Sequence, residues 1–128
     1  MTFQPRREGF NAVSPYLVVD GADATIRFLT AVFDAEELRR QTRPDGSVMH
    51  AEVRIDDSVI MLGDRAPDWP PIPSHVHVYV PNVDDTYARA LEVGGEPVQE
   101  PVQQGDEDKR GGVKDPGGTT WWIATTVG

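Results

Sequence analysis

Apolar and polar residues alternate without interruption from position 75 to position 80 of the chain. Val76, Val78 and Val80 alternate with His75, His77 and Tyr79. Since successive side chains of a β-strand point to opposite faces, the stretch predicts a strand with one apolar face and one face of imidazole and phenol groups. We expect this strand to place its chemistry on one side of a sheet and the core on the other.

The pattern before this strand predicts a strand, a helix and three further strands. Apolar residues recur at helical spacing in residues 26–33, which predicts an amphipathic helix. Asp20 or Asp23 is expected to cap its start, and Asp34 to end it. The sequence Pro-Asp-Gly at 44–46 predicts a turn. The strands are expected at residues 13–19, 36–41, 48–55 and 58–62.

The same order returns in the second half of the chain. Asn82 or Asp84 can cap a second helix, and the glycine pair at 94–95 is typical of a helix C-terminus. This helix is expected to bury Tyr87, Ala90 and Leu91. Its flanking strands are expected at residues 75–80, 96–98, 110–114 and 119–126, with an acidic polar loop at 102–109 and a turn at 115–118.

This repetition predicts the fold class and the domain organisation. We expect an α+β fold of two βαβββ units, about 13–63 and 75–126, within a single domain at 13–128. A proline-rich linker at 64–74 joins them, and a flexible arm at 1–12 precedes them. Each helix covers one sheet face, so the other faces should meet in a curved mixed sheet, with the helices outside and a cavity between the units or between two chains.

Composition and charge narrow the range of partners. The net charge of −9 argues against nucleic acid and against an anionic membrane surface. There are no cysteines, so neither a disulfide framework nor thiol chemistry is expected. No apolar run reaches membrane-spanning length, and the first nine residues lack the apolar segment of a secretory signal, so the expected location is cytoplasmic.

Four motifs resemble those of one protein superfamily. They are Tyr-Leu-Val-Val-Asp-Gly at 16–21, His-Ala-Glu-Val-Arg-Ile at 50–55, the alternating strand at 75–80, and Arg-Gly-Gly-Val-Lys-Asp-Pro-Gly-Gly at 110–118 before Trp121. Their order and spacing resemble the vicinal oxygen chelate superfamily, which contains glyoxalase I, bleomycin-resistance proteins and extradiol dioxygenases. The resemblance covers nearly all of the chain after the arm, and the small bacterial glyoxalase-like branch is the most similar.

The resemblance also implies where a metal would bind. Enzymes of this superfamily hold a divalent ion with one side chain from each of four strands, and the ion stabilises an anionic intermediate as a Lewis acid. The corresponding positions fall at or near Ser14, Met61, His75 and Trp122. Only His75 is a suitable ligand, so no metal or other cofactor is expected. If a divalent metal does bind, we expect His75 to hold it with His77, His50 or Glu52.

Several residues are candidates for a ligand-binding site, while no catalytic residue is assigned. Glu52 and Arg54 could grip charged groups of a ligand, and Glu52 could act as a general base, or the two could form a surface ion pair. Only one of Trp121 and Trp122 can face the helix side of the sheet. Trp69 could cover a cavity mouth or anchor the linker. The candidate ligand-binding residues are Tyr16, His50, Glu52, Arg54, His75, His77, Tyr79, Arg110 and Trp122.

Two functions follow from these candidates, and the sequence leaves both open. The first is metal-independent binding of a small organic molecule in an aromatic cavity, as the resemblance to bleomycin-resistance proteins implies. The second is a lyase, isomerase or dioxygenase that uses a non-standard metal site around His75, or acid–base groups such as Glu52 and His77. A third hypothesis is a retained dimer architecture without a ligand.

A homodimer is expected because sheets of this size leave open edges and the superfamily closes its cavities with a partner chain.

Overall fold

The computed structural model describes residues 5–128, and it confirms the α+β fold of two βαβββ repeats. We call the first repeat, residues 16–64, the N-module, and the second, residues 75–126, the C-module. The N-module consists of β1 (Tyr16–Val19), α1 (Ala22–Phe33), β2 (Glu36–Thr42), β3 (Val48–Ile55) and β4 (Ser58–Asp64). The C-module consists of β5 (His75–Tyr79), α2 (Val83–Glu92), β6 (Glu96–Gln103), β7 (Asp108–Lys114) and β8 (Thr120–Thr126).

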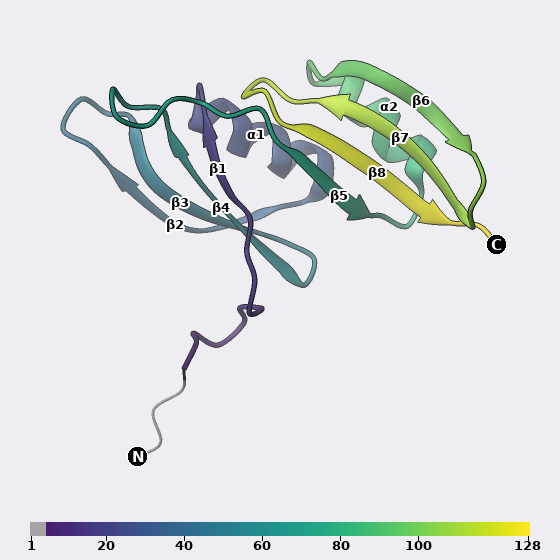
Figure 1. Ribbon diagram of the computed structural model, residues 1–128, viewed down its shortest axis with the longest axis horizontal. Helices are drawn as coiled ribbons and strands as arrows, with labels where there is room; N and C mark the ends of the chain where they lie inside the picture. The colour runs from purple at the N-terminus through teal and green to yellow at the C-terminus, as the bar shows by residue number, and fades with distance from the viewer. Residues whose placement is uncertain (1–4) are drawn as a thin grey trace.

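The strands form two four-stranded mixed sheets with equivalent topology. The order is β1-β4-β3-β2 in the N-module and β5-β8-β7-β6 in the C-module. In each sheet the first strand pairs in parallel with the last, β1 with β4 and β5 with β8, and the other pairs are antiparallel. Figure 1 shows the sheets side by side, with α1 at their junction and α2 behind β7 and β8.

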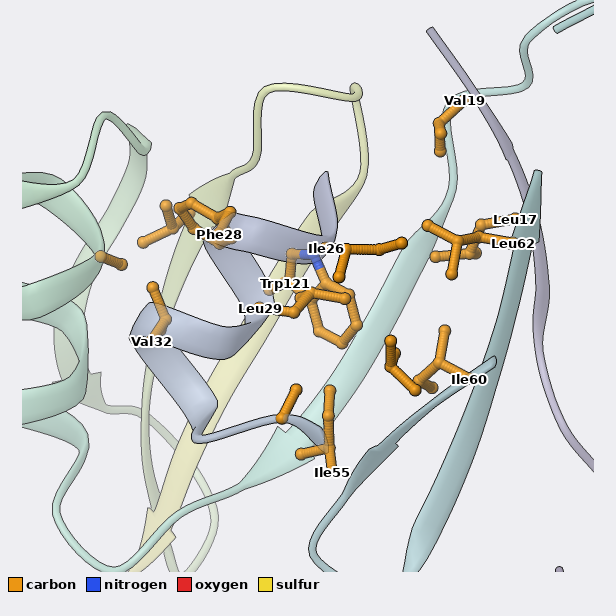
Figure 2. Close-up of a cluster of buried hydrophobic side chains, with 14 of the residues drawn as sticks. Leu17, Val19, Ile26, Phe28, Leu29, Val32, Ile55, Ile60, Leu62 and Trp121 are labelled. Atoms are coloured by element: carbon orange, nitrogen blue, oxygen red, sulfur yellow. The ribbon is translucent and has the colours of Figure 1, made fainter. Parts of the chain in front are cut away.

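A hydrophobic core between the sheets and helices joins the two modules. Trp121 of β8 is 1% exposed and packs against Phe33 of α1, with 5.3 Å between ring centroids. Figure 2 shows Trp121 beside Ile26 and Leu29 of α1, between the helix and the strands of the N-module. As predicted, its neighbour Trp122 points to the opposite face. Because core side chains of both modules contact the same helix, each module stabilises the other.

The start of α1 differs from the prediction of an Asp20 or Asp23 cap. Its N-cap is Gly21 at φ 98°, and Asp64 at the end of β4 accepts hydrogen bonds from the backbone N–H groups of Gly21 (3.1 Å) and Ala22 (2.7 Å). Glycine reaches this positive φ without strain. A carboxylate from a distant strand therefore replaces the local cap. The helix ends at Asp34, as predicted.

The start of α2 is as predicted, but its buried face is not entirely so. The Asn82 side chain accepts a hydrogen bond from the Asp85 N–H at 3.1 Å, which is the expected cap. Tyr87 and Ala90 are buried, whereas Leu91 is exposed and Val83 takes its place in the core. The prediction failed for Leu91 because one helical step turns its side chain away from the sheet.

The largest difference in secondary structure concerns β6 and the segment after it. β6 runs from Glu96 to Gln103, whereas the sequence predicted a strand at 96–98 and an acidic loop at 102–109. Pro97 and Pro101 obscured the strand, and the pairing with β7 is interrupted on both sides of Gln99. Such irregular pairing suits β6 because an edge strand needs only one partner.

Among residues 5–128, no helix combines the length and apolar character needed to cross a membrane.

Candidate functional site

Each sheet has one face that the helices do not cover, which we call the helix-free face. In the N-module this face carries a chain of hydrogen-bonded side chains. The Tyr16 hydroxyl lies 3.2 Å from His50 Nδ1, and His50 Nε2 lies 2.9 Å from Glu52 Oε2. The sheet register produces this order, because alternate residues of β3 share a face and Glu52 is paired with Met61, which is itself paired with Tyr16. The sequence therefore builds a Tyr–His–Glu cluster from two separate strands.

Arg7 of the N-terminal arm completes this cluster. Its guanidinium donates two hydrogen bonds to the Glu52 carboxylate, at 2.7 and 3.2 Å, and lies 4.2 Å from the centroid of the Phe10 ring. The hydrogen bonds from Arg7 hold the pKa of the Glu52 carboxyl below its ordinary value. An ionised carboxylate can only accept, so His50 donates from Nε2 to Glu52, and its Nδ1 shares the other hydrogen bond with the Tyr16 hydroxyl.

The wall of this cluster is aromatic. Trp69 packs against Tyr16 with 5.5 Å between ring centroids, and the Tyr16 ring lies 5.6 Å from the His50 ring. Gly63 provides space, because a Cβ at this position would lie 2.6 Å from the Met49 carbonyl oxygen and 3.4 Å from the Tyr16 hydroxyl. Burial raises the pKa of Tyr16, so its phenol stays protonated at neutral pH.

The helix-free face of the C-module has a different network, centred on Asp108. Its carboxylate accepts hydrogen bonds from the Tyr79 hydroxyl (2.7 Å), the Thr126 hydroxyl (2.9 Å) and the Arg110 guanidinium (3.1 Å). Arg110 Nε also donates to His77 Nε2 at 3.1 Å. The hydrogen bond from Tyr79 lowers the pKa of Asp108, and burial together with the nearby Arg110 charge lowers the pKa of His77. His77 is therefore a neutral ring beside a cation.

The second feature of this face is a stacked pair of rings. His75 and Trp122 are nearly parallel, with 12° between ring planes and 6.2 Å between centroids, and Trp122 Nε1 donates to His75 Nδ1 at 3.0 Å. Trp122 lies across Gly112 of β7, where a Cβ would come within 2.7 Å of the indole ring. His75 is exposed, and Tyr79 is 60% exposed. The C-module therefore presents flat aromatic surface to solvent.

Two cavities lie at the junction of the modules rather than over the Tyr–His–Glu cluster. The larger, about 390 Å³, includes Phe33 and Tyr79 in its lining. The smaller, about 310 Å³, lies between the β3–β4 turn and β5, and both Tyr79 and His77 line it. Apolar walls with a few polar groups are typical of small-molecule sites, and this volume is at the lower end of their range. His77 and Tyr79 of β5 therefore belong both to the helix-free face of the C-module and to the lining of this cavity, which also includes the buried Trp121.

The predicted site residues fall into two groups. Tyr16, His50 and Glu52 meet on the N-module, and His75, His77, Tyr79, Arg110 and Trp122 lie on the C-module. Arg54 joins neither group, because its nearest carboxylate is Glu36, 3.7 Å away. Glu52 is not part of a surface pair with Arg54, since its side chain is 2% exposed and paired with Arg7.

Two residues of these networks were missed from the sequence. Arg7 was assigned to a flexible arm, of which residues 1–4 lie outside the described part of the chain, and its partner is 45 positions away. Asp108 was assigned to a solvated loop, yet it is buried at the start of β7. Its spacing of two residues from Arg110 was a usable indication, because such residues share a strand face.

The chain does not fit the four-ligand metal site of related enzymes. Three of its expected positions carry the poor ligands Ser14, Met61 and Trp122, and the fourth, His75, accepts a hydrogen bond from Trp122. The alternative set is divided, since His50 and Glu52 lie on β3 and His75 and His77 on β5 of the other sheet. Within residues 5–128, no three His, Asp or Glu side chains are grouped to hold an ion.

Comparison with known proteins matches residues 9–123 to the family described as the Glyoxalase/Bleomycin resistance protein/Dioxygenase superfamily. The uncharacterized protein Mb0911c of Mycobacterium bovis is 36% identical over 127 aligned residues, which cover 91% of this chain and 84% of that protein.

Two solved structures illustrate the similarity of the fold. TioX from Micromonospora sp. ML1 has a TM-score of 0.71 and 20% identity, covering 90% of this chain and 95% of that one. TnmS3, an antibiotic-binding protein from Streptomyces sp. CB03234, has a TM-score of 0.69 and 20% identity, covering 91% and 98%. At this identity the likeness concerns the fold.

Proposed function

The chain belongs to the glyoxalase/bleomycin resistance protein/dioxygenase superfamily, and from this premise we propose that it binds a small organic molecule without the metal site usual for that superfamily's enzymes. The observation that carries the proposal is the exposed aromatic face of the C-module. There the stacked His75–Trp122 pair is accompanied on β5 by Tyr79, which is exposed and also lines a cavity of about 310 Å³. A flat ligand would stack on these rings and extend into the cavity.

The polar groups of this face indicate how such a ligand would be oriented. Arg110 has a fixed guanidinium, held by Asp108 and His77, which can donate to a carbonyl or phenolate oxygen of the ligand. The neutral His77 ring offers a further hydrogen-bonding group. TnmS3, which has a similar fold, is described as an antibiotic-binding protein, and this supports a small organic molecule as ligand.

A homodimer is part of this proposal. The aromatic face is open in a single chain, and a second copy placed over it would enclose the ligand and bury exposed apolar area. Light scattering should give twice the 14.1 kDa mass of one chain at micromolar concentration. A monomer at every concentration would contradict the dimer but leave the ligand-binding proposal intact. We place this binding protein in the cytoplasm.

The experiment that tests the function is a screen of aromatic natural products, read through tryptophan fluorescence. A ligand should quench the wild-type protein, and Trp122→Phe should weaken its binding at least tenfold. Trp69→Phe is the matched control, since it removes an indole that packs against Tyr16 of the N-module, away from the C-module face. Ligands that bind equally well to both variants would contradict the site.

The alternative is a metal-dependent enzyme with a non-standard site around His75, and it has its own test. Elemental analysis of protein purified without chelator should find well under one Zn, Ni, Fe or Mn per chain. Near-stoichiometric metal that His75→Ala removes would contradict metal-free binding and favour the enzyme.

A further inference from the structure

Glu52 is a buried charge whose only Lys or Arg partner among the described residues comes from the N-terminal arm. Its side chain is 2% exposed, whereas that of Arg7 is 46% exposed. Arg7 belongs to no helix or strand, and its neighbours at 5–9 are exposed. The arm is held by this ion pair and by the Asn11 amide, which donates to the Asp57 carbonyl at 3.0 Å. A weakly packed segment therefore neutralises a well-packed carboxylate.

The cluster behind the carboxylate is arranged for a cation whether or not Arg7 occupies it. His50 Nε2 donates to Glu52 Oε2 at 2.9 Å, and the Tyr16 hydroxyl bonds His50 on its other side. Both carboxylate oxygens then have lone pairs free for a planar donor with two parallel N–H groups. Removal of the arm without a replacement cation would leave a buried, uncompensated charge.

We propose that this cluster is a binding subsite for an organic cation of the amidinium or guanidinium class, and that Arg7 occupies it in the free protein as an internal substitute. The bidentate contact of Arg7, at 2.7 and 3.2 Å, shows the geometry that a ligand would reproduce. The Tyr16 and Trp69 rings, 5.5 Å apart, supply the adjoining aromatic wall. The inference extends the proposed function, because it names a ligand class for the N-module face.

Competition with the arm sets the size of the expected effect. If Arg7 occupies the subsite in about nine molecules of ten, the apparent affinity for an added cation falls about tenfold. Removal of Arg7 should recover that factor. An amidinium should be preferred over an ammonium, which is a point charge and cannot form two parallel hydrogen bonds.

The test uses benzamidine as probe and calorimetry as readout, with the full chain. Arg7→Ala should bind benzamidine about tenfold more tightly than wild type. Arg6→Ala is the matched control, since it removes the same charge from an exposed position on the same arm, and its affinity should equal that of wild type. The double variant R7A/E52Q should lose binding, and benzamide, the neutral analogue, should not bind.

A second measurement uses the unaltered protein, so it holds even if Arg7→Ala is unstable. In NMR spectra of wild type, benzamidine at millimolar concentration should shift the Arg7 Nε–H, Gly9 N–H and Trp69 indole signals. Unchanged signals, or equal affinity of Arg7→Ala and wild type, would overturn the inference. Its failure is distinguishable from failure of the proposed function, which depends on Trp122 and on aromatic ligands that bind the C-module face.

Discussion

The two modules share a topology, but the side chains on their helix-free faces differ in exposure and in hydrogen-bond partners. In the N-module the charged centre, Glu52, is 2% exposed and covered by the chain's own arm. In the C-module Tyr79 is 60% exposed and its partner Asp108 is satisfied within the sheet. The charged group of the N-module face is therefore covered by its own chain, whereas the ring of Tyr79 on the C-module face is open to solvent.

This difference shows that two repeats of one fold can present different chemical groups. The N-module contributes a buried ionic cluster that a cation must complete, while the C-module contributes flat rings and a guanidinium that need no further partner. Because β1 and β5 begin the two sheets in equivalent positions, the contrast comes from side chains rather than from topology. The open face is where an external ligand would be bound first.

The largest expected effect concerns the core that joins the modules. Trp121→Ala should lower the free energy of unfolding by about 3–5 kcal/mol, because it removes a fully buried ring that packs against α1. Trp122→Ala, one residue along the same strand, should lower the free energy of unfolding much less, but it should abolish ligand binding. Urea denaturation of both variants checks this. Equal losses would mean that the helix-free face of β8 is also core.

The next effect compares a glycine in one central strand of each sheet, Gly63 in β4 and Gly112 in β7. Gly63→Ala should cost about 1–3 kcal/mol, because the added methyl group meets the Met49 backbone at 2.6 Å. In Gly112→Ala the nearest atoms to the added methyl group belong to the Trp122 ring, at 2.7 Å, so the change should displace that ring and weaken ligand binding more than stability. Thermal melts and fluorescence titration separate the two outcomes. A stable Gly63→Ala would show that the N-module face is less tightly packed than described.

The ion pairs of the two faces give a third comparison. Arg7→Ala should destabilise the protein by about 1–3 kcal/mol, because it leaves a buried acceptor without its charged partner. Arg110→Ala should cost less, since Asp108 keeps hydrogen bonds from Tyr79 and Thr126. Urea midpoints measure both losses. If Arg110→Ala proved the more damaging, the closed face would be the C-module and the comparison would be reversed.

Sequence patterns predicted the repeat because it depends on local alternation. The strand at 75–79 and the helices around Phe33 and Tyr87 follow from spacing within a few residues. Contacts between distant segments were not predictable in this way. The Asp64 cap of α1 and the Arg7–Glu52 pair join residues 42 and 45 positions apart. The sequence identified the candidate site residues one by one. Which of them share a sheet could be learned only from the pairing of the strands.

The smallest expected effect is the change in the pH dependence of stability when His77 is replaced. Burial and the nearby Arg110 lower the pKa of His77 in the folded protein. The unfolded chain therefore binds a proton first as pH falls, so His77 contributes stability that is present above about pH 6.5 and lost below it. In His77→Gln the slope of stability against pH just below that value should be shallower, which denaturation at several pH values would show. An unchanged slope would mean that the folded protein does not lower the pKa of His77.

The central claim, that ligands bind the open face of the C-module, is tested most directly by the three indole N–H signals of the protein in NMR. A ligand from the fluorescence screen should shift the Trp122 signal and leave that of the buried Trp121 nearly unchanged. Benzamidine should instead shift the Trp69 signal. If a ligand from the screen saturates the protein and the Trp122 indole signal does not shift, the account is contradicted.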